Sequence, residues 1–198
     1  MKKVLLVVAV LIGIVLFFFS LFISFKNTAV EYEENAKTKW SKVESAYQRR
    51  NDLIGNLVKT VQGAADFEKS TLTDVINARA KATAVTLNTG DLSAANLAKF
   101  QQAQQGLSGA LSKLMVSVER YPDLKANRNF LELQSQLEGT ENRISVARDR
   151  YNDDVNLFNK HLKKFPGSFW VGFTDFKEMD RYKADKGSEK ARDVNFKF

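Results

Sequence analysis

The sequence contains no cysteine, a single histidine and only two prolines, and these shortages exclude several classes of function. Without cysteine the chain can form no disulfide, no thiolate zinc site and no cysteine nucleophile. His161 has no second histidine beside which to bind a metal, and no nucleophile elbow with which to form a Ser-His-Asp triad. We interpret His161 as an exposed residue on a helix.

Phosphate-binding loops and paired acids are also missing. The ten glycines form neither a G-x-x-x-x-G-K-[ST] nor a G-x-G-x-x-G pattern. Adjacent acids such as Asp153 and Asp154 point in different directions on a helix, so they cannot readily share a proton or a metal. The sequence therefore predicts a protein that is not an enzyme and has no catalytic residue, cofactor or metal site.

Positive charge is in excess, with 30 Lys and Arg against 23 Asp and Glu, a net charge of +7. Such a balance is compatible with binding to nucleic acid or anionic lipid. However, acids and bases alternate along the chain, as where Glu33 and Glu34 precede Lys37 and Lys39, and no basic stripe carries interleaved aromatics. We therefore favour a solvated mixed surface and expect no nucleic-acid partner.

Residues 4–25 form a continuous apolar run without a charge. As a helix this run is roughly 33 Å long, enough to cross the hydrocarbon core of a bilayer. It is longer than the apolar part of a typical signal peptide, and no A-x-A cleavage site follows it. We therefore predict a retained transmembrane anchor, with the bilayer as partner through residues 4–25, rather than a cleaved leader.

Lysines near the anchor bear on its orientation in the membrane. Lys2 and Lys3, in the charged N-terminus 1–3, outweigh Lys26 and favour a cytoplasmic N-terminus with the domain on the non-cytoplasmic side. Lys37 and Lys39 lie within the counting window on the far side. The cytoplasmic orientation of the domain therefore stays open.

Apolar residues recur every seven positions after the anchor, which indicates helices that bury one face. The second expected helix has a shorter inner face, formed by Leu72, Val75, Ile76 and Ala80. The seven-residue series of the other helices are Trp40, Tyr47, Ile54 and Val61; Phe100, Leu107, Leu114 and Tyr121; and Phe130, Leu137, Ile144, Tyr151, Phe158 and Phe165.

Helix boundaries follow from capping and breaking residues. We expect helices near 28–65 and 67–85, a third that starts at a cap near Asp91 and ends at Pro122, and a fourth capped by Asp123 or Asn127. Short connections make successive helices antiparallel. The expected fold is all-α: a transmembrane helix followed by an antiparallel four-helix bundle with long first and fourth helices. The bundle spans residues 26–165, and residues 166–198 form an aromatic turn and a loosely ordered tail.

Charged residues on the fourth helix indicate ion pairs between helices. Glu141 and Arg148 lie two turns apart on one face. We expect pairing of such carboxylates with Arg49, Arg50 or Arg79, because a half-buried arginine requires a carboxylate. A ligand site that includes Arg49 and Arg50 is the alternative.

Several segments, in order and at characteristic spacing, resemble the LemA family. The resemblance covers nearly the whole chain from the anchor onward. These segments are Gln48–Val58, Glu119–Asn127, Glu138–Ile144, Ala147–Arg148, Tyr151–Asn152 and Phe165–Pro166.

The resemblance implies a bacterial membrane protein with a largely antiparallel helical bundle, and it implies no defined activity. Members are often encoded near membrane proteases or other envelope proteins. Two positions depart from the family pattern: Gly55 replaces a usual proline, and Phe67 stands where histidine is common. A local bend at Gly55 and no chemistry at position 67 are the consequences.

The aromatic turn that follows Phe165 is a candidate interaction surface, through Phe169, Trp170, Phe173 and Phe176. Because the fourth helix runs back toward the anchor, Phe165 should return close to Lys26. The turn then either rests on the bilayer or on a membrane partner, where aromatic rings are favoured, or folds back over the end of the bundle core.

Together these features predict a membrane-anchored adaptor or scaffold of the cell envelope that presents a bundle surface to another protein. A membrane protease or another envelope protein is the expected kind of partner, and self-association is open. The alternative is a protein that binds anionic lipid or remodels membranes through its basic juxtamembrane face.

Overall fold

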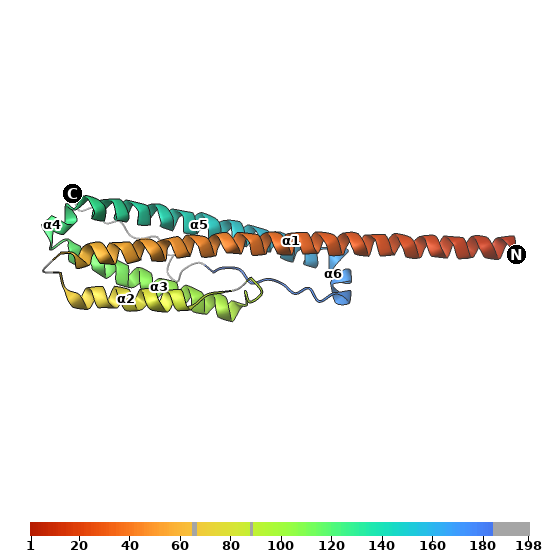
Figure 1. Ribbon diagram of the computed structural model, residues 1–198. Coiled ribbons are helices and arrows are strands. Elements are labelled where there is room, and N and C mark those ends of the chain that lie inside the picture. Colours follow the sequence, from red (N-terminus) through yellow and green to blue (C-terminus); the bar gives the residue numbers. More distant parts are fainter. Residues whose placement is uncertain (65–66, 88, 184–198) are drawn as a thin grey trace, which may run out of the picture.

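The computed structural model describes residues 1–64, 67–87 and 89–183, which form helices and no strand, so the predicted all-α class is confirmed (Figure 1). Four helices make up most of this part, and three short helical turns join or follow them. The long helices are α1 (Lys2–Gln62), α2 (Lys69–Ala84), α3 (Ala94–Val118) and α5 (Arg128–Lys163), and the short ones are α4 (Pro122–Lys125), α6 (Gly167–Trp170) and the 3-10 turn η1 (Val171–Phe173).

Helix α1 has 61 residues, about 92 Å at 1.5 Å per residue, and combines two parts with different surroundings. Its apolar N-terminal part is long and apolar enough to cross a membrane, and residues 4–20 are exposed, with no other described segment over them. Beyond Phe25 the same helix buries a stripe in which Trp40, Val43, Ile54 and Val61 are fully inaccessible. The helix continues without interruption through Gly55, so the anchor and the first bundle helix form one rod.

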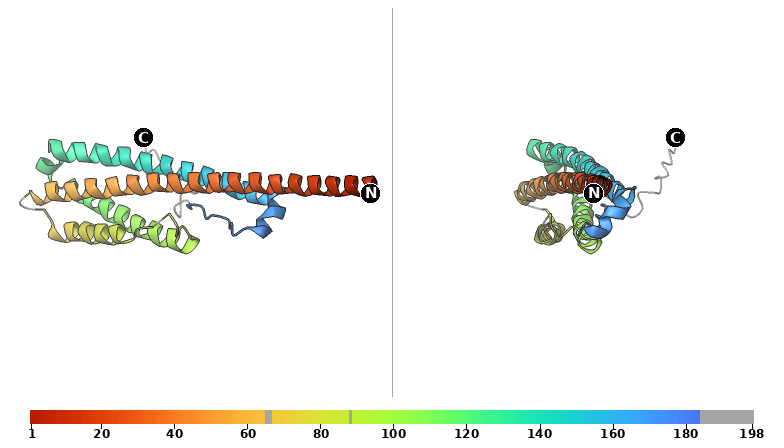
Figure 2. Two further views of the ribbon diagram at one scale, coloured as in Figure 1. Left: turned by 45° about the vertical axis from the view of Figure 1, so that its right-hand side comes forward. Right: turned by 90° about the vertical axis from the view of Figure 1, so that its right-hand side faces the viewer.

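Helices α1 and α5 lie side by side and antiparallel, and they share the longest interface of the molecule (Figure 1). In the view along α1 in Figure 2, α2 and α3 lie together on one side of this pair. Their side chains complete the distal core, in which Leu107, Leu114 and Val75 pack against Leu57 and Leu137. The bundle is therefore a long two-helix frame, half of which is covered by a shorter pair.

The buried face of α2 differs from the predicted one. Leu72 and Val75 are buried as expected, but Ile76 is 43% exposed and Ala80 faces solvent, while Ala82 is buried instead. The reason is Arg79, whose Nε donates a 2.7 Å hydrogen bond to the carbonyl oxygen of Asn51 on α1. This contact turns the Arg79 face of α2 toward α1.

Two helix caps follow the expected chemistry, one of them at a different residue. Asn127 caps α5, since its side-chain oxygen accepts hydrogen bonds from the backbone N–H groups of Asn129 and Phe130. Helix α3 is capped by Ser93, two residues after Asp91, and the Ser93 hydroxyl oxygen accepts a hydrogen bond from the Asn96 N–H. Between them, Pro122 opens the short α4, because a proline is well tolerated in the first turn of a helix.

Residues 174–183 were expected to be loosely ordered, and in the structure they run as an extended segment along the bundle. This segment, here called the strap, is held by two asparagines of α5. Asn159 accepts from the N–H of Met179 and donates to its carbonyl, both at 2.9 Å. Asn152 makes the same two-way pair with Tyr182, at 2.9 and 3.0 Å. The rest of the predicted tail, residues 184–198, lies outside the described residues.

The spacing of the two asparagines explains why they hold an extended chain. Seven helical residues rise about 10.5 Å, and three extended residues span about 10 Å. Each asparagine side chain therefore bonds to the backbone N–H and C=O of one strap residue. Met179 and Tyr182 also pack into the core toward the anchor, where Tyr182 joins Leu97 and Phe100 of α3 and Met179 reaches Phe158 of α5. The strap thus completes the proximal half of the bundle.

Replacing Asn159 with alanine should release the strap locally. The substitution removes two hydrogen bonds, each worth about 1 kcal/mol, so amide exchange in residues 174–183 should rise roughly ten- to thirty-fold. Hydrogen–deuterium exchange by mass spectrometry measures this directly. Asn142→Ala, on an exposed position of the same helix, is the matched control. Equal exchange in both variants would mean that the asparagine does not hold the strap.

Candidate functional site: a basic groove between α1 and α5

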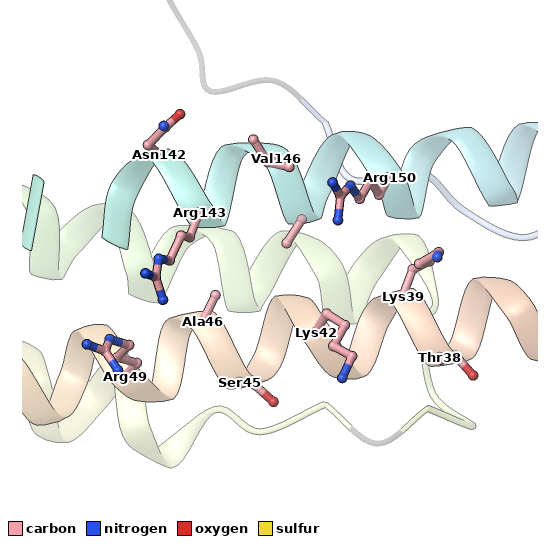
Figure 3. A pocket seen from close by; sticks show the side chains of 11 residues that line it. Thr38, Lys39, Lys42, Ser45, Ala46, Arg49, Asn142, Arg143, Val146 and Arg150 are labelled. Carbon is pink, nitrogen blue, oxygen red and sulfur yellow. The ribbon is translucent and has the colours of Figure 1, made fainter. Parts of the chain in front are cut away.

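A groove of about 550 Å³ runs between α1 and α5 (Figure 3). Two neighbouring helices line it, each with one row of side chains. The lining residues are Thr38, Lys39, Lys42, Ser45, Ala46 and Arg49 of α1, and Asn142, Arg143, Val146, Ala147 and Arg150 of α5.

The groove follows from the residues that flank the seven-residue series on each helix. Ala46 and Ala147 are half-buried against the core, and their small side chains form a shallow floor where the helices approach. Longer side chains stand on both sides of these alanines. The result is an open channel parallel to the axis of α1, with an apolar floor and polar walls.

Five cations line the groove: Lys39, Lys42, Arg49, Arg143 and Arg150. No lining residue is acidic, and none of the five makes an ion pair with any residue that the structure describes. Figure 3 shows Arg143 and Arg150 on the α5 side of the groove, across from Arg49, Lys42 and Lys39 on the α1 side. Because like charges that face each other repel, an anion placed between them would be stabilised by both rows.

Arg49 and Arg50, the two arginines predicted to contribute to an interaction surface, lie in different environments. Arg49 is exposed and lines the groove. Arg50 is only 3% exposed and cannot contact a partner. Its guanidinium donates a 2.8 Å hydrogen bond to Glu141 on α5, which confirms the expected ion pair between helices. Arg50 therefore holds the bundle together and is not part of the interaction surface.

The Arg50 cluster connects all four long helices. Besides Glu141, Arg50 donates to Ser108 and to the side chain of Gln104, both on α3. Gln104 in turn donates to the carbonyl of Ala82 on α2. A buried cation whose partners lie on two other helices, one of which is bonded onward to a third, has only one satisfactory packing, so this cluster sets the register of the bundle.

Next to this cluster, Arg50 lies over the ring of Tyr47, with 4.9 Å between the guanidinium and the ring centre. The Tyr47 hydroxyl is hydrogen-bonded to that of Tyr182 in the strap at 2.9 Å. Burial, reinforced by Tyr182, raises the pKa of Tyr47 far above its usual range. The Tyr47 phenol therefore stays protonated. Arg148, the other expected member of the ion pairs, lies over the Tyr182 ring at 4.9 Å.

His161 was expected to be exposed, and this interpretation is wrong. Its ring is partly buried and stacks on Phe25 with 4.9 Å between centroids, and its Nε2 lies 3.0 Å from the Phe25 carbonyl oxygen. The reason is the length of α5, because its last turn lies beside Phe25 at the end of the anchor. His161 thus joins the end of the bundle to the start of the membrane segment.

The predicted aromatic turn is placed beside this same end of the anchor. Trp170 contacts Phe22 with 5.6 Å between ring centroids, and Phe176 packs against the buried Phe158. Phe169 and Phe173 point away from the core and are 57% and 67% exposed. The four residues named from the sequence therefore divide into two that cover the core and two that do not.

Four of the five groove cations were missed from the sequence. Lys39, Lys42, Arg143 and Arg150 were not singled out as interaction residues. The sequence does contain a signal, because each of these four cations directly precedes a core residue of its helix. Packing of α1 against α5 brings the cations of both helices to the same side of the bundle. Detecting it requires knowing which flank of α1 faces which flank of α5.

The fold and the groove define a class of protein: a single-pass, membrane-associated helical-bundle protein whose bundle continues its membrane helix. Comparison with known families agrees with this class. The sequence matches the LemA family over residues 39–198. The chain belongs to the LemA family.

Curated relatives include both magnetosome proteins and a LemA protein. Magnetosome protein MamQ 2 of Paramagnetospirillum magneticum is 27% identical over 174 residues, which covers 79% of this chain. Magnetosome protein MamQ of Magnetospirillum gryphiswaldense is 26% identical over the same share. Protein LemA of Metamycoplasma hominis is 23% identical over 75% of this chain. The chain spans 64% of the length of each of these relatives.

Proposed function

We propose that this protein is a membrane-anchored, non-enzymatic adaptor of the bacterial cell envelope whose basic groove binds an acidic segment of another protein. The observation that carries the proposal is the set of five cations on two antiparallel helices, with no lining carboxylate and no ion-pair partner in the described part of the chain. A membrane protease or another envelope protein is the kind of partner that a membrane-anchored groove would meet. The domain lies on the non-cytoplasmic side in this proposal.

The height of the groove favours a protein over a lipid as the ligand. Lys39 and Arg49 follow Phe25 by 14 and 24 residues, which is about 21 and 36 Å along the continuous helix α1. Electrostatic attraction to headgroups is screened within about 8 Å at physiological salt. Unless α1 lies nearly flat on the membrane, the groove is beyond the reach of anionic lipid.

The spacing of the cations suits an extended peptide. Arg143 and Arg150 are seven residues apart on α5, about 10.5 Å. In the polyproline II conformation, which has three residues per turn and rises about 3.1 Å per residue, acidic side chains three positions apart lie on one face about 9 Å apart, so they would match both cations at once. Arginine also binds carboxylates through two parallel hydrogen bonds, which adds specificity.

A charge reversal in the groove tests the proposal. The full-length chain in detergent is titrated with a fluorescent peptide that carries glutamate at every third position. The variant Arg49→Glu/Arg143→Glu should weaken binding at least ten-fold, because two attractive pairs become repulsive. Binding to the original chain should also fall as salt is added.

Lys99→Glu/Lys113→Glu is the matched control, since it reverses two exposed lysines on α3 with the same change in net charge. Equal loss in both variants would show that only net charge matters and would contradict a specific site. In native membranes, the groove variant should likewise lose crosslinks that the control retains. Crosslinks that change with anionic lipid content but not with the groove variant would favour lipid binding.

A further inference from the structure

The end of the bundle nearest the anchor lies level with the end of the membrane segment. The bundle part of α1 after Phe25 has 37 residues and α5 has 36, so the two helices cover nearly equal lengths. His161 at the end of α5 accordingly contacts Phe25, and Trp170 contacts Phe22, which lies inside the apolar run. In Figure 1, α6 is at the extremity of the bundle on the side of the N-terminus. The turn after α5 is therefore at the depth where the anchor leaves the bilayer.

The close approach of this turn to the anchor depends on Gly167. A Cβ atom at Gly167 would lie 2.2 Å from the His161 carbonyl oxygen and 3.0 Å from the Phe25 ring. With glycine, the turn reaches the anchor and leaves a cavity of about 310 Å³ beside it, lined by Leu21 and Ser24 of the anchor and Phe165 of the turn. The turn and the end of the anchor thus lie side by side.

Three phenylalanines of this turn are left exposed. Phe165, Phe169 and Phe173 are 86%, 57% and 67% exposed, and among the described residues they are the only exposed phenylalanines outside the anchor. Phe169 and Phe173 lie against each other, with 5.5 Å between ring centroids. Single exposed aliphatic residues are ordinary on a protein surface, whereas clustered aromatic rings are not.

We infer that Phe165, Phe169 and Phe173 insert into the interface of the bilayer beside the anchor and give the bundle a second contact with lipid. Phenylalanine is among the residues whose apolar side chains bury into the boundary between headgroups and acyl chains. Lys26 and Lys164 are exposed next to the turn and are placed to meet lipid phosphates. The anchor and the turn beside it would then both contact the bilayer. Two such contacts would restrict the tilt of the bundle, so the groove would be held at a defined height above the membrane.

The absence of cysteine allows a direct measurement of depth. Phe169→Cys and Phe173→Cys each create a single attachment site for a nitroxide label in the full-length chain, reconstituted in phosphatidylcholine vesicles with one-fifth phosphatidylglycerol. Both labels should collide more often with oxygen, which concentrates in lipid, than with a polar nickel chelate. Val116→Cys, on α3 and 73% exposed, is the control and should show the opposite preference. Labels at 169 and 173 that behave like the one at 116 would overturn the inference.

A second measurement tests whether the three phenylalanine rings hold the turn in the bilayer interface. A label at Ser168→Cys should be shielded from the nickel chelate in the original chain and become accessible in a variant with Phe165, Phe169 and Phe173 changed to serine. Because the three rings are exposed, this variant should keep the thermal melting curve of the original chain. Equal shielding of the label in both backgrounds would show that the helices alone place the turn, and would refute insertion.

Discussion

Ile144→Asp should lower the free energy of unfolding of the bundle by about 3–5 kcal/mol. Ile144 is 2% exposed at the centre of the seven-residue series of α5, in the same core cluster as Trp40 and Tyr151. An aspartate there would bury a charge for which none of these neighbours is a partner. Chemical denaturation in detergent, followed by tryptophan fluorescence, measures the loss, because Trp40 is fully buried and reports on this core.

Leu131→Asp provides the comparison for Ile144→Asp. Leu131 lies on the same helix but is 49% exposed, so an aspartate remains solvated and the expected change stays within about 0.5 kcal/mol. If the denaturation midpoint of Ile144→Asp matched that of Leu131→Asp, the packing of α5 against α1 would have to be different from the one described.

Glu141→Gln should destabilise the bundle by about 2–4 kcal/mol, since it leaves the buried guanidinium of Arg50 without its carboxylate. The expected loss of stability is smaller than for a fully buried pair, because Glu141 itself is half exposed and part of its charge is already solvated. Loss of the pair should also weaken the register among helices, because Arg50 connects α1 with α3 and α5. Both effects appear in a denaturation curve, as a lower midpoint and a broader transition.

Glu138→Gln is the control for Glu141→Gln, as it removes the same charge one turn away, where the exposed Glu138 has only Gln134 as its described partner. A double variant, Arg50→Met/Glu141→Leu, should recover much of the stability, because replacing both members of an ion pair leaves no charge without a partner. Equal stability of Glu141→Gln and Glu138→Gln would mean that Arg50 does not depend on its carboxylate.

Much of the fold could be predicted because its determinants are local. The uncharged run 4–25, the series through Ile144 and the cap at Asn127 each depend on the spacing of a few neighbouring residues. The ion pair of Arg50 with Glu141 was also within reach, because a buried arginine requires a carboxylate and few were suitably placed. The inner face of α2 was less predictable, because its position depends on a polar contact from Arg79 to the backbone of another helix.

The interaction surfaces were harder to predict. Arg49 and Arg50 are neighbours in sequence, yet one lines the groove and the other is buried, because successive helical residues differ by about 100° in direction. Phe169 and Trp170 divide in the same way between solvent and core. The sequence shows that the turn is aromatic, but only the packing of α6 against the anchor decides which of its rings remain exposed to solvent.

The sequence by itself determined that this protein is an all-helical, membrane-anchored member of its family, with a continuous rod as its frame. Periodic apolar residues carry that information, because burial of a stripe needs nothing beyond spacing along one helix. Only the tertiary structure decided that five cations face one groove, that two asparagines hold the strap, and that three phenylalanines remain exposed beside the anchor. Each of these depends on which flank of a helix meets which neighbour, and a seven-residue period is the same for either flank.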